Sequence, residues 1–209
     1  MNAADAAIVG RYDYRLVALS IVVAVMASYT AVDLGGRVAA SRGWGRLGWL
    51  GGGGAAMGFG IWSMHYVGMV AFRLPVPVRY HWPTAMLSYA IAFVASVAAL
   101  VLVSRREVGV GRVVAGSGFM GAAIAGLHYV AMASMRLQAM HHYSAALVTL
   151  SVAFAVVFSL IALQLAFLVR ELGKKAAKAA EFPACAFAAV ARFALFADRS
   201  MAIDYRLVI

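Results

Sequence analysis

The sequence predicts an all-α membrane protein: a polytopic transmembrane bundle of about five helices, with a sixth left open, built from tandem helical-hairpin repeats. Its 209 residues are 65% hydrophobic and have a mean hydropathy of +0.88. Only 12% of them are charged, against roughly 25% in soluble domains. The uncharged residues gather in long stretches, and one segment occurs twice. Composition, stretch length and repetition together predict this fold.

Five stretches of 19 to 25 residues contain no charged side chain apart from Asp33 at the end of the first. A helix of about 20 apolar residues crosses the hydrocarbon core of a bilayer, so each stretch is a candidate span. The stretches cover residues 16–34, 48–72, 84–103, 113–135 and 145–169.

One segment within these stretches recurs 63 residues later in the chain. Residues 57–69 read MGFGIWSMHYVGM, and residues 120–132 read MGAAIAGLHYVAM. Each copy places a histidine, His65 or His128, inside an apolar stretch. Burying an imidazole in a membrane-spanning segment costs free energy, so a duplicated histidine indicates a functional site.

A second pattern marks the first, third and fifth stretches, in which a tyrosine is followed by two serines at eight-residue intervals. Residues eight apart lie on one stripe of a helix, and small side chains there let helices approach closely. We therefore interpret these serines as packing surface. The three copies are Tyr12, Ser20, Ser28; Tyr80, Ser88, Ser96; and Tyr143, Ser151, Ser159.

The net charge of +10 indicates membrane topology rather than nucleic-acid binding. Lys and Arg residues in alternate connections total 5 on one side and 10 on the other. The positive-inside rule then places the N-terminus outside and the Lys-rich segment after residue 173 in the cytoplasm. Besides the bilayer itself, anionic lipid headgroups are the expected partner of these charges.

Residues 1–173 are expected to form the membrane domain and residues 174–209 a basic cytoplasmic or interfacial tail. A third copy of the repeated segment would place a histidine near position 191, but the sequence has Ala191 followed by Arg192. Burying an arginine in a span costs about 2.5–3.5 kcal/mol, so a sixth span is the less favoured alternative.

The repeated segment carries potential metal ligands at helical spacing. His65 and Met69 lie four residues apart and share one helix face, and His128 and Met132 repeat that arrangement. If the two repeats pack about a pseudo-symmetric axis, two imidazoles and two thioethers converge near the outer ends of their helices. This donor set suits copper, Cu(I) especially. Met64 is a further candidate ligand, and Met135 and Met140 could add further thioethers.

Other readings stay open on the same residues. An intramembrane histidine can simply hydrogen-bond across helices. Two histidines on neighbouring helices can also supply both axial ligands of a haem, and a copper-handling permease would use similar donors. Tyr66 and Tyr129, which follow the histidines directly, either hydrogen-bond near the ligands or belong to the interfacial aromatic belt. No nucleophile–base constellation is present, so we do not predict an enzyme.

The segment GIWSMHYVGM, its degenerate copy LHYVAM and the serine-bearing spans resemble the MHYT domain, a bacterial integral-membrane sensor module, over residues 12–172. The resemblance implies a multi-pass protein of the bacterial inner membrane that binds a metal, copper by expectation, and senses a diatomic gas such as O2, CO or NO. The implied ligand types are the Met, His and Tyr of the motif, here Met64, His65 and Tyr66, with His128 and Tyr129 in the second copy. The third motif has no counterpart in this chain, and any signal would pass to a cytoplasmic partner.

Overall fold

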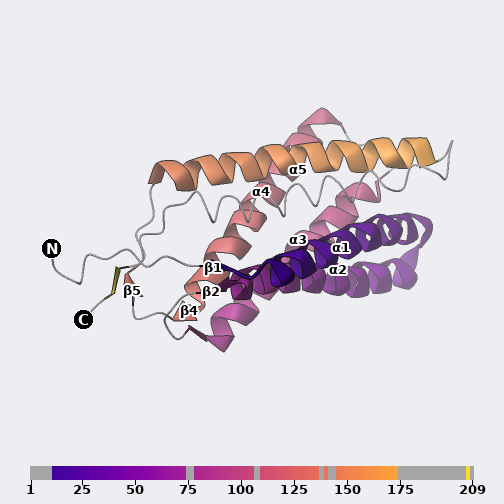
Figure 1. Ribbon diagram of the computed structural model, residues 1–209. Helices are drawn as coiled ribbons and strands as arrows, with labels where there is room; N and C mark the ends of the chain where they lie inside the picture. Colours follow the sequence, from indigo (N-terminus) through magenta and orange to yellow (C-terminus); the bar gives the residue numbers. More distant parts are fainter. Residues whose placement is uncertain are drawn as a thin grey trace.

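A computed structural model of the chain describes residues 11–73, 78–105, 109–136, 139–140, 145–173 and 206–207. Each helix in this part packs mainly against the next one along the chain, and α2 also reaches α4 (Figure 1). The all-α bundle predicted from the sequence is thus confirmed. Its helices are α1 (Tyr14–Ala40), α2 (Gly43–Ala71), α3 (Trp82–Val103), α4 (Val110–Ala133) and α5 (Ala145–Gly173).

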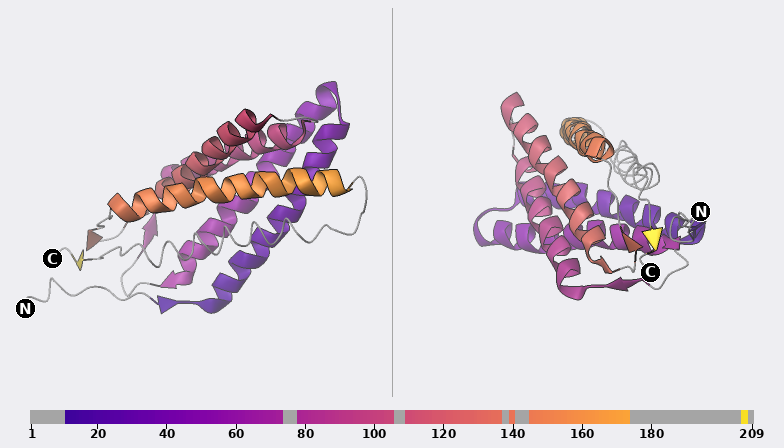
Figure 2. Two further views of the ribbon diagram at one scale, coloured as in Figure 1. Left: turned by 90° about the horizontal axis from the view of Figure 1, so that it is seen from above. Right: turned by 90° about the vertical axis from the view of Figure 1, so that its left-hand side faces the viewer.

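Short antiparallel strand pairs lie together at one end of the bundle, which we call the strand end (Figures 1 and 2). The first pair joins the start of α1 to the end of α2, and the second joins the start of α3 to the end of α4, so each pair closes one helical hairpin. The pairs are β1 (Arg11–Tyr12) with β2 (Phe72–Arg73), β3 (Arg79–Tyr80) with β4 (Met135–Arg136), and β5 (Ala139–Met140) with β6 (Arg206–Leu207).

Residues 174–205 lie outside the described part of the chain, so the predicted tail over 174–209 stays a prediction. The third strand pair places Arg206 and Leu207 beside Ala139 and Met140, at the end of the bundle where α5 begins.

Four helices of the described residues are long and apolar enough to cross a membrane: α1, α3, α4 and residues 145–168 of α5. The second predicted span forms a helix of 29 residues, α2, but it is not among these four. Its glycines, together with Trp62, Ser63 and His65, make it less apolar than its neighbours. At 1.5 Å per residue α2 is nevertheless about 43 Å long, and it packs between α1 and α3.

The interior of the bundle is rich in small side chains, alongside some leucines and methionines, while many large apolar side chains face outward. Leu150 and Phe154 of α5, for example, are exposed, as are Val22 and Met26 of α1. In lipid no hydrophobic force drives helices together, so small interior residues favour association by letting the backbones approach. Five of the six serines in the predicted stripes are accordingly buried, and Ser151 is partly buried. The buried serines are Ser20, Ser28, Ser88, Ser96, Ser104, Ser117, Ser134 and Ser159.

Two glycines at equivalent positions of the repeat set the closest helix crossings. A Cβ built on Gly58 of α2 would lie 2.9 Å from the backbone of Phe93 in α3. A Cβ on Gly121 of α4 would lie 2.7 Å from the Cα of Val156 in α5. Phe93 and Val156 are themselves 63 residues apart, so both hairpin-to-hairpin crossings use the same geometry. No side chain larger than hydrogen fits at either crossing without moving a helix.

We expect Gly58→Ala and Gly121→Ala to lower the free energy of unfolding by about 1–3 kcal/mol each, because the added methyl group meets backbone. Gly52→Ala in α2 is the matched control, since nothing lies within 4 Å of its Cβ position. That substitution should be neutral or slightly stabilising through helix propensity. Denaturation in mixed detergent micelles, followed by circular dichroism, measures the difference. Equal effects at Gly58 and Gly52 would contradict the close crossing.

Backbone hydrogen bonds and one ion pair close the first hairpin at the strand end. Asp13 N–H donates to the carbonyl of Ala71 at 2.8 Å, and the equivalent bond of the second hairpin joins His81 N–H to Ser134 O at 2.7 Å. The Asp13 carboxylate caps α1 by accepting from Arg15 N–H, and it also pairs with Arg73 at 2.9 Å. The Arg15 N–H and then the Arg73 guanidinium hold the pKa of Asp13 below its usual 3.8.

Because the pKa of Asp13 is lowered by folding, its carboxylate stabilises the protein above pH 3.8, and this contribution disappears as pH falls through the lowered value. Asp13→Asn should therefore reduce the midpoint of thermal unfolding slightly at pH 7. The difference from the unsubstituted protein should shrink as the pH is lowered from 7 to below 3.8. Thermal scans in detergent between these pH values test the expectation, and a difference that grows on acidification would refute it.

Candidate metal centre

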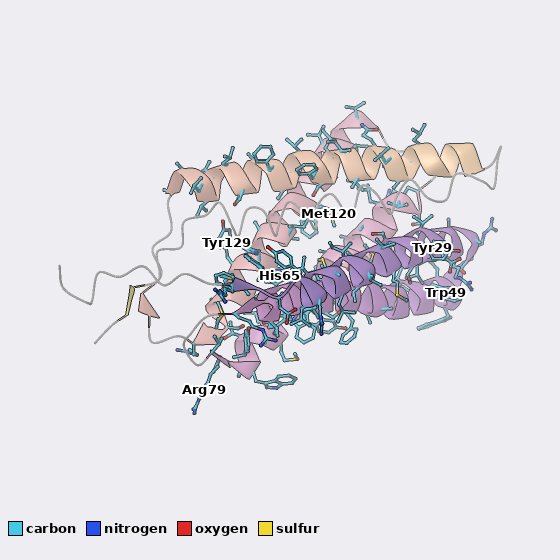
Figure 3. The ribbon with its side chains drawn as sticks, in the orientation of Figure 1. Tyr29, Trp49, His65, Arg79, Met120 and Tyr129 are labelled. Carbon is cyan, nitrogen blue, oxygen red and sulfur yellow. The ribbon has the colours of Figure 1, made fainter. Side chains whose placement is uncertain are left out.

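The two repeated histidines meet between α2 and α4. The ring centroids of His65 and His128 are 5.1 Å apart, and the rings are in edge-to-face contact. The histidines are six and five residues from the last residues of their helices, so they lie about 8–9 Å from the strand end along the helix axes. Figure 3 shows His65 in the half of the bundle nearer to Arg79, away from Tyr29 and Trp49. The convergence of the two imidazoles predicted from the repeat is thus confirmed.

One nitrogen of this pair lacks a hydrogen-bond partner. The Nε2 atom of His65 is buried and has no acceptor or donor within reach among the described residues. An unpaired buried polar group costs about 1–3 kcal/mol, so proteins seldom retain one without a use for it. The arrangement therefore presents a free lone pair or N–H beside a second imidazole.

The thioethers predicted to accompany the histidines also come together. Met69 and Met132 are buried in one cluster with Ala131 and Met135, one helical turn nearer the strand end than the imidazoles. Met135 of β4, a further thioether that the sequence suggested, joins them, and it has no counterpart in the first repeat because position 72 holds a phenylalanine. The soft sulfur atoms thus lie on the strand-end side of the imidazole pair.

Met64 differs from the other predicted thioether ligands. It is only partly buried, whereas Met69 and Met132 are buried, and it does not belong to the cluster of Met69, Met132 and Met135. Its backbone carbonyl accepts a hydrogen bond from the hydroxyl of Ser20 on α1 at 3.0 Å. The structure therefore places Met64 on the α1 contact without bringing its thioether to the other sulfur atoms.

Both tyrosines that follow the histidines are hydrogen-bonded to serines. The Tyr66 hydroxyl lies 3.0 Å from Ser134 Oγ, and the Tyr129 hydroxyl lies 3.0 Å from Ser151 Oγ. The sequence interpretation left hydrogen bonding or an interfacial belt open for these tyrosines. The structure favours hydrogen bonding, with partners that the serine frame only partly indicated.

Aromatic rings surround Tyr66 on the side of α3. The Trp62 ring is 4.7 Å from the Tyr66 ring, and the Trp62 indole N–H donates to Ala85 O and Ser88 Oγ, each at 3.1 Å. Tyr80 of β3 lies 5.9 Å from Tyr66, and partial burial, with a smaller contribution from Tyr66, raises its pKa. Trp62 has no repeat signal, because the second copy has Ala125 at that position.

The described residues contain no group of three or more His, Cys, Asp or Glu side chains that could share a metal ion. Zinc in protein sites is usually held by four such ligands, or by three with a water. Two imidazoles with thioethers close by fit a softer ion better, and copper is the metal that this donor set suits.

Comparison with known proteins agrees with the repeat. Residues 58–116 and 121–179 each match MHYT, the family described as "Bacterial signalling protein N terminal repeat". The two matches begin 63 residues apart, as the repeated segments do, and together they cover more than half of the chain. This chain belongs to the MHYT family, and it is a multi-pass membrane protein of the kind found in bacterial signalling proteins.

Several curated bacterial proteins are similar to this chain. The bifunctional diguanylate cyclase/cyclic di-GMP phosphodiesterase MucR of Pseudomonas aeruginosa is 44% identical over 163 residues, which is 78% of this chain and 24% of that protein. The signaling protein YkoW of Bacillus subtilis is 36% identical over 156 residues, 75% of this chain and 19% of its own length. The cyclic di-GMP phosphodiesterase NbdA of Pseudomonas aeruginosa is 39% identical over 145 residues, 69% of this chain and 18% of its own length.

The chain thus spans about a fifth to a quarter of the length of these relatives. The sequence predicts no set of catalytic residues in the matched region. The family description likewise concerns only an N-terminal repeat. No solved structure matches the chain.

The unpaired Nε2 leads to a stability prediction for metal-free protein. His65→Leu should leave the free energy of unfolding unchanged or raise it by about 1 kcal/mol, because it removes a buried polar atom without a partner. His81→Leu is the control: His81 is exposed, and its Nδ1 lies 2.8 Å from Thr84 Oγ1. Detergent denaturation in the presence of a chelator measures both. A clear loss of stability in His65→Leu would mean that the imidazole has a structural partner.

Proposed function

We propose that this chain is the membrane-embedded sensory module of a bacterial signalling protein and that it binds copper between His65 and His128. The single observation that carries the proposal is the contact of two repeat-equivalent imidazoles, 5.1 Å apart, with a buried unpaired nitrogen on one of them. Met69 and Met132, one turn away on the same helices, would supply thioethers. Soft and intermediate donors of these kinds favour Cu(I).

The geometry of the histidine pair supports a single ion over a haem. Axial ligation by two histidines requires the porphyrin plane to lie between the two rings. The rings of His65 and His128 are instead in direct edge-to-face contact. In addition, the bundle around them is closed by small-residue packing, with Gly58 and Gly121 at the two close crossings. A haem would require α2 and α4 to separate, whereas a metal ion requires only small movements of the two imidazoles.

The relatives of this chain support a sensory role for the site. The relatives' names describe cyclic di-GMP synthesis or breakdown, or signalling, and the region that this chain matches is only a fraction of those proteins. A bound copper would supply an open coordination position for a diatomic ligand such as O2, CO or NO. The residues of this chain would convert occupancy into a change in the relation between α2 and α4, since each helix carries one of the two histidines.

The signal would then reach a cytoplasmic partner or domain at the end of the bundle opposite the strand end. The positive-inside rule supports this orientation, with the N-terminus and the strand end outside. In that orientation the Met69–Met132–Met135 cluster lies between the imidazoles and the outside, where soft metal ions would arrive.

The proposal predicts stoichiometric copper in protein purified from membranes in detergent. His65→Ala combined with His128→Ala should abolish it, because no other imidazole lies in the described site. His81→Ala should retain copper, because its imidazole is exposed at the start of α3. Elemental analysis and optical spectra of the three proteins provide the measurement. Copper that survives the double substitution refutes the proposal, and a Soret band lost with either histidine establishes haem instead.

A further inference from the structure

The hydroxyl groups of Tyr66 and Tyr129 each bond a serine on another element, and the serine protons decide the direction of these bonds. Ser134 Oγ lies 2.6 Å from the carbonyl of Ala131, to which it donates, and Ser151 Oγ donates to Val148 O at 2.8 Å. A serine hydroxyl has one proton. Each serine has therefore used its proton on its own helix, and the tyrosine must be the donor in both bonds.

The same reasoning applies to the other neighbour of Tyr66. Ser88 Oγ donates to Ala85 O at 2.7 Å and accepts from the Trp62 indole N–H. Its proton is also committed, and it lies farther from the Tyr66 hydroxyl, at 3.5 Å, than Ser134 does at 3.0 Å. Tyr66 thus keeps its phenolic proton and directs it to Ser134.

The direction of the Tyr66 ring agrees with this role. Adjacent residues point about 100° apart around a helix, so Tyr66 and His65 do not share a face. The Tyr66 ring packs with Trp62, which precedes it by one turn, and against the cluster of Met69, Met132 and Met135, while its hydroxyl lies at Ser134 Oγ. The ring centroids of Tyr66 and His65 are 6.2 Å apart and nearly perpendicular. The hydroxyl of Tyr66 therefore forms its hydrogen bond with Ser134, beside the imidazole pair.

We propose that Tyr66 is a positioning residue, a neutral hydrogen-bond donor that ties α2 to the end of α4, and not a metal ligand. Tyr66 follows His65 on α2, and Ser134 follows directly after α4, the helix of His128. The bond therefore joins the two histidine-bearing helices, and through them the two repeats. A metal-bound phenolate would lack the proton that this bond uses.

The link is not repeated in the first hairpin. Position 71, which corresponds to Ser134 through the 63-residue offset, is Ala71. Tyr129 donates instead to Ser151 of α5, a helix without a site histidine. Tyr66 is thus the member of the pair whose removal should change the metal site, and Tyr129 is its natural control.

The test is a double-mutant cycle of Tyr66→Phe and Ser134→Ala, with Tyr129→Phe as the control. Its metal readouts rest on the proposed copper site. Tyr66→Phe and Ser134→Ala should each weaken copper binding about 3- to 15-fold, with unchanged stoichiometry, and the double variant should be no weaker than either. Tyr129→Phe should change the affinity less. Electron paramagnetic resonance of the Cu(II) form should keep its nitrogen couplings in Tyr66→Phe while its parameters shift with the changed imidazole geometry.

Two observations would overturn the inference. A phenolate-to-copper charge-transfer band that disappears in Tyr66→Phe would make Tyr66 a ligand. So would the release of one proton fewer on metal binding by Tyr66→Phe than by the unsubstituted protein. Additive effects of Tyr66→Phe and Ser134→Ala on the unfolding of metal-free protein would remove the bond itself. Coupling in that metal-free cycle, in a protein that binds no copper, would uphold the link and refute only the proposed function.

Discussion

The structure depends on the close approach of helix backbones, which small residues make possible. In lipid, burying large apolar side chains between helices gains no hydrophobic free energy, because lipid tails are equally apolar. Association of the helices therefore requires close approach of their backbones and paired polar groups in the interior. Gly58 and Gly121 provide that approach at equivalent places in the two repeats. Gly58 brings α2 against α3, and Gly121 brings α4 against α5. The contact of His65 with His128 is a separate one, between α2 and α4.

The polar interior of the bundle is organised by carbonyl groups that accept from serines. Ser88, Ser134 and Ser151 donate to carbonyls of their own helices, which frees their oxygen atoms to accept. Trp62 and the two motif tyrosines use those acceptors. The Nε2 atom of His65 is buried without a partner among the described residues, as are Ser96 Oγ and Ser159 Oγ elsewhere in the bundle. A bundle that satisfies its other site residues in this way leaves one unsatisfied group at the place where the repeats meet.

The two repeats are equivalent in backbone and unequal in side chains. Both hairpins close at the strand end by the same backbone bond and cross the following helix at the same glycine. Trp62 and Ser134, however, each belong to one repeat only. Their contacts with Tyr66 therefore have no sequence counterpart in the second motif.

The sequence alone determined the helical membrane fold, the repeat and the pair of histidines. Apolar composition and the 63-residue repeat follow from the order of residues along the chain and do not depend on how the helices pack. It also predicted that Met69 and Met132 would meet, since each lies one turn from its histidine. Only the tertiary structure decided that Met135 joins them, that Met64 stays apart and that Tyr66 bonds Ser134. These contacts depend on how neighbouring helices rotate and cross, and no spacing along a single helix specifies the side chain that a neighbour presents.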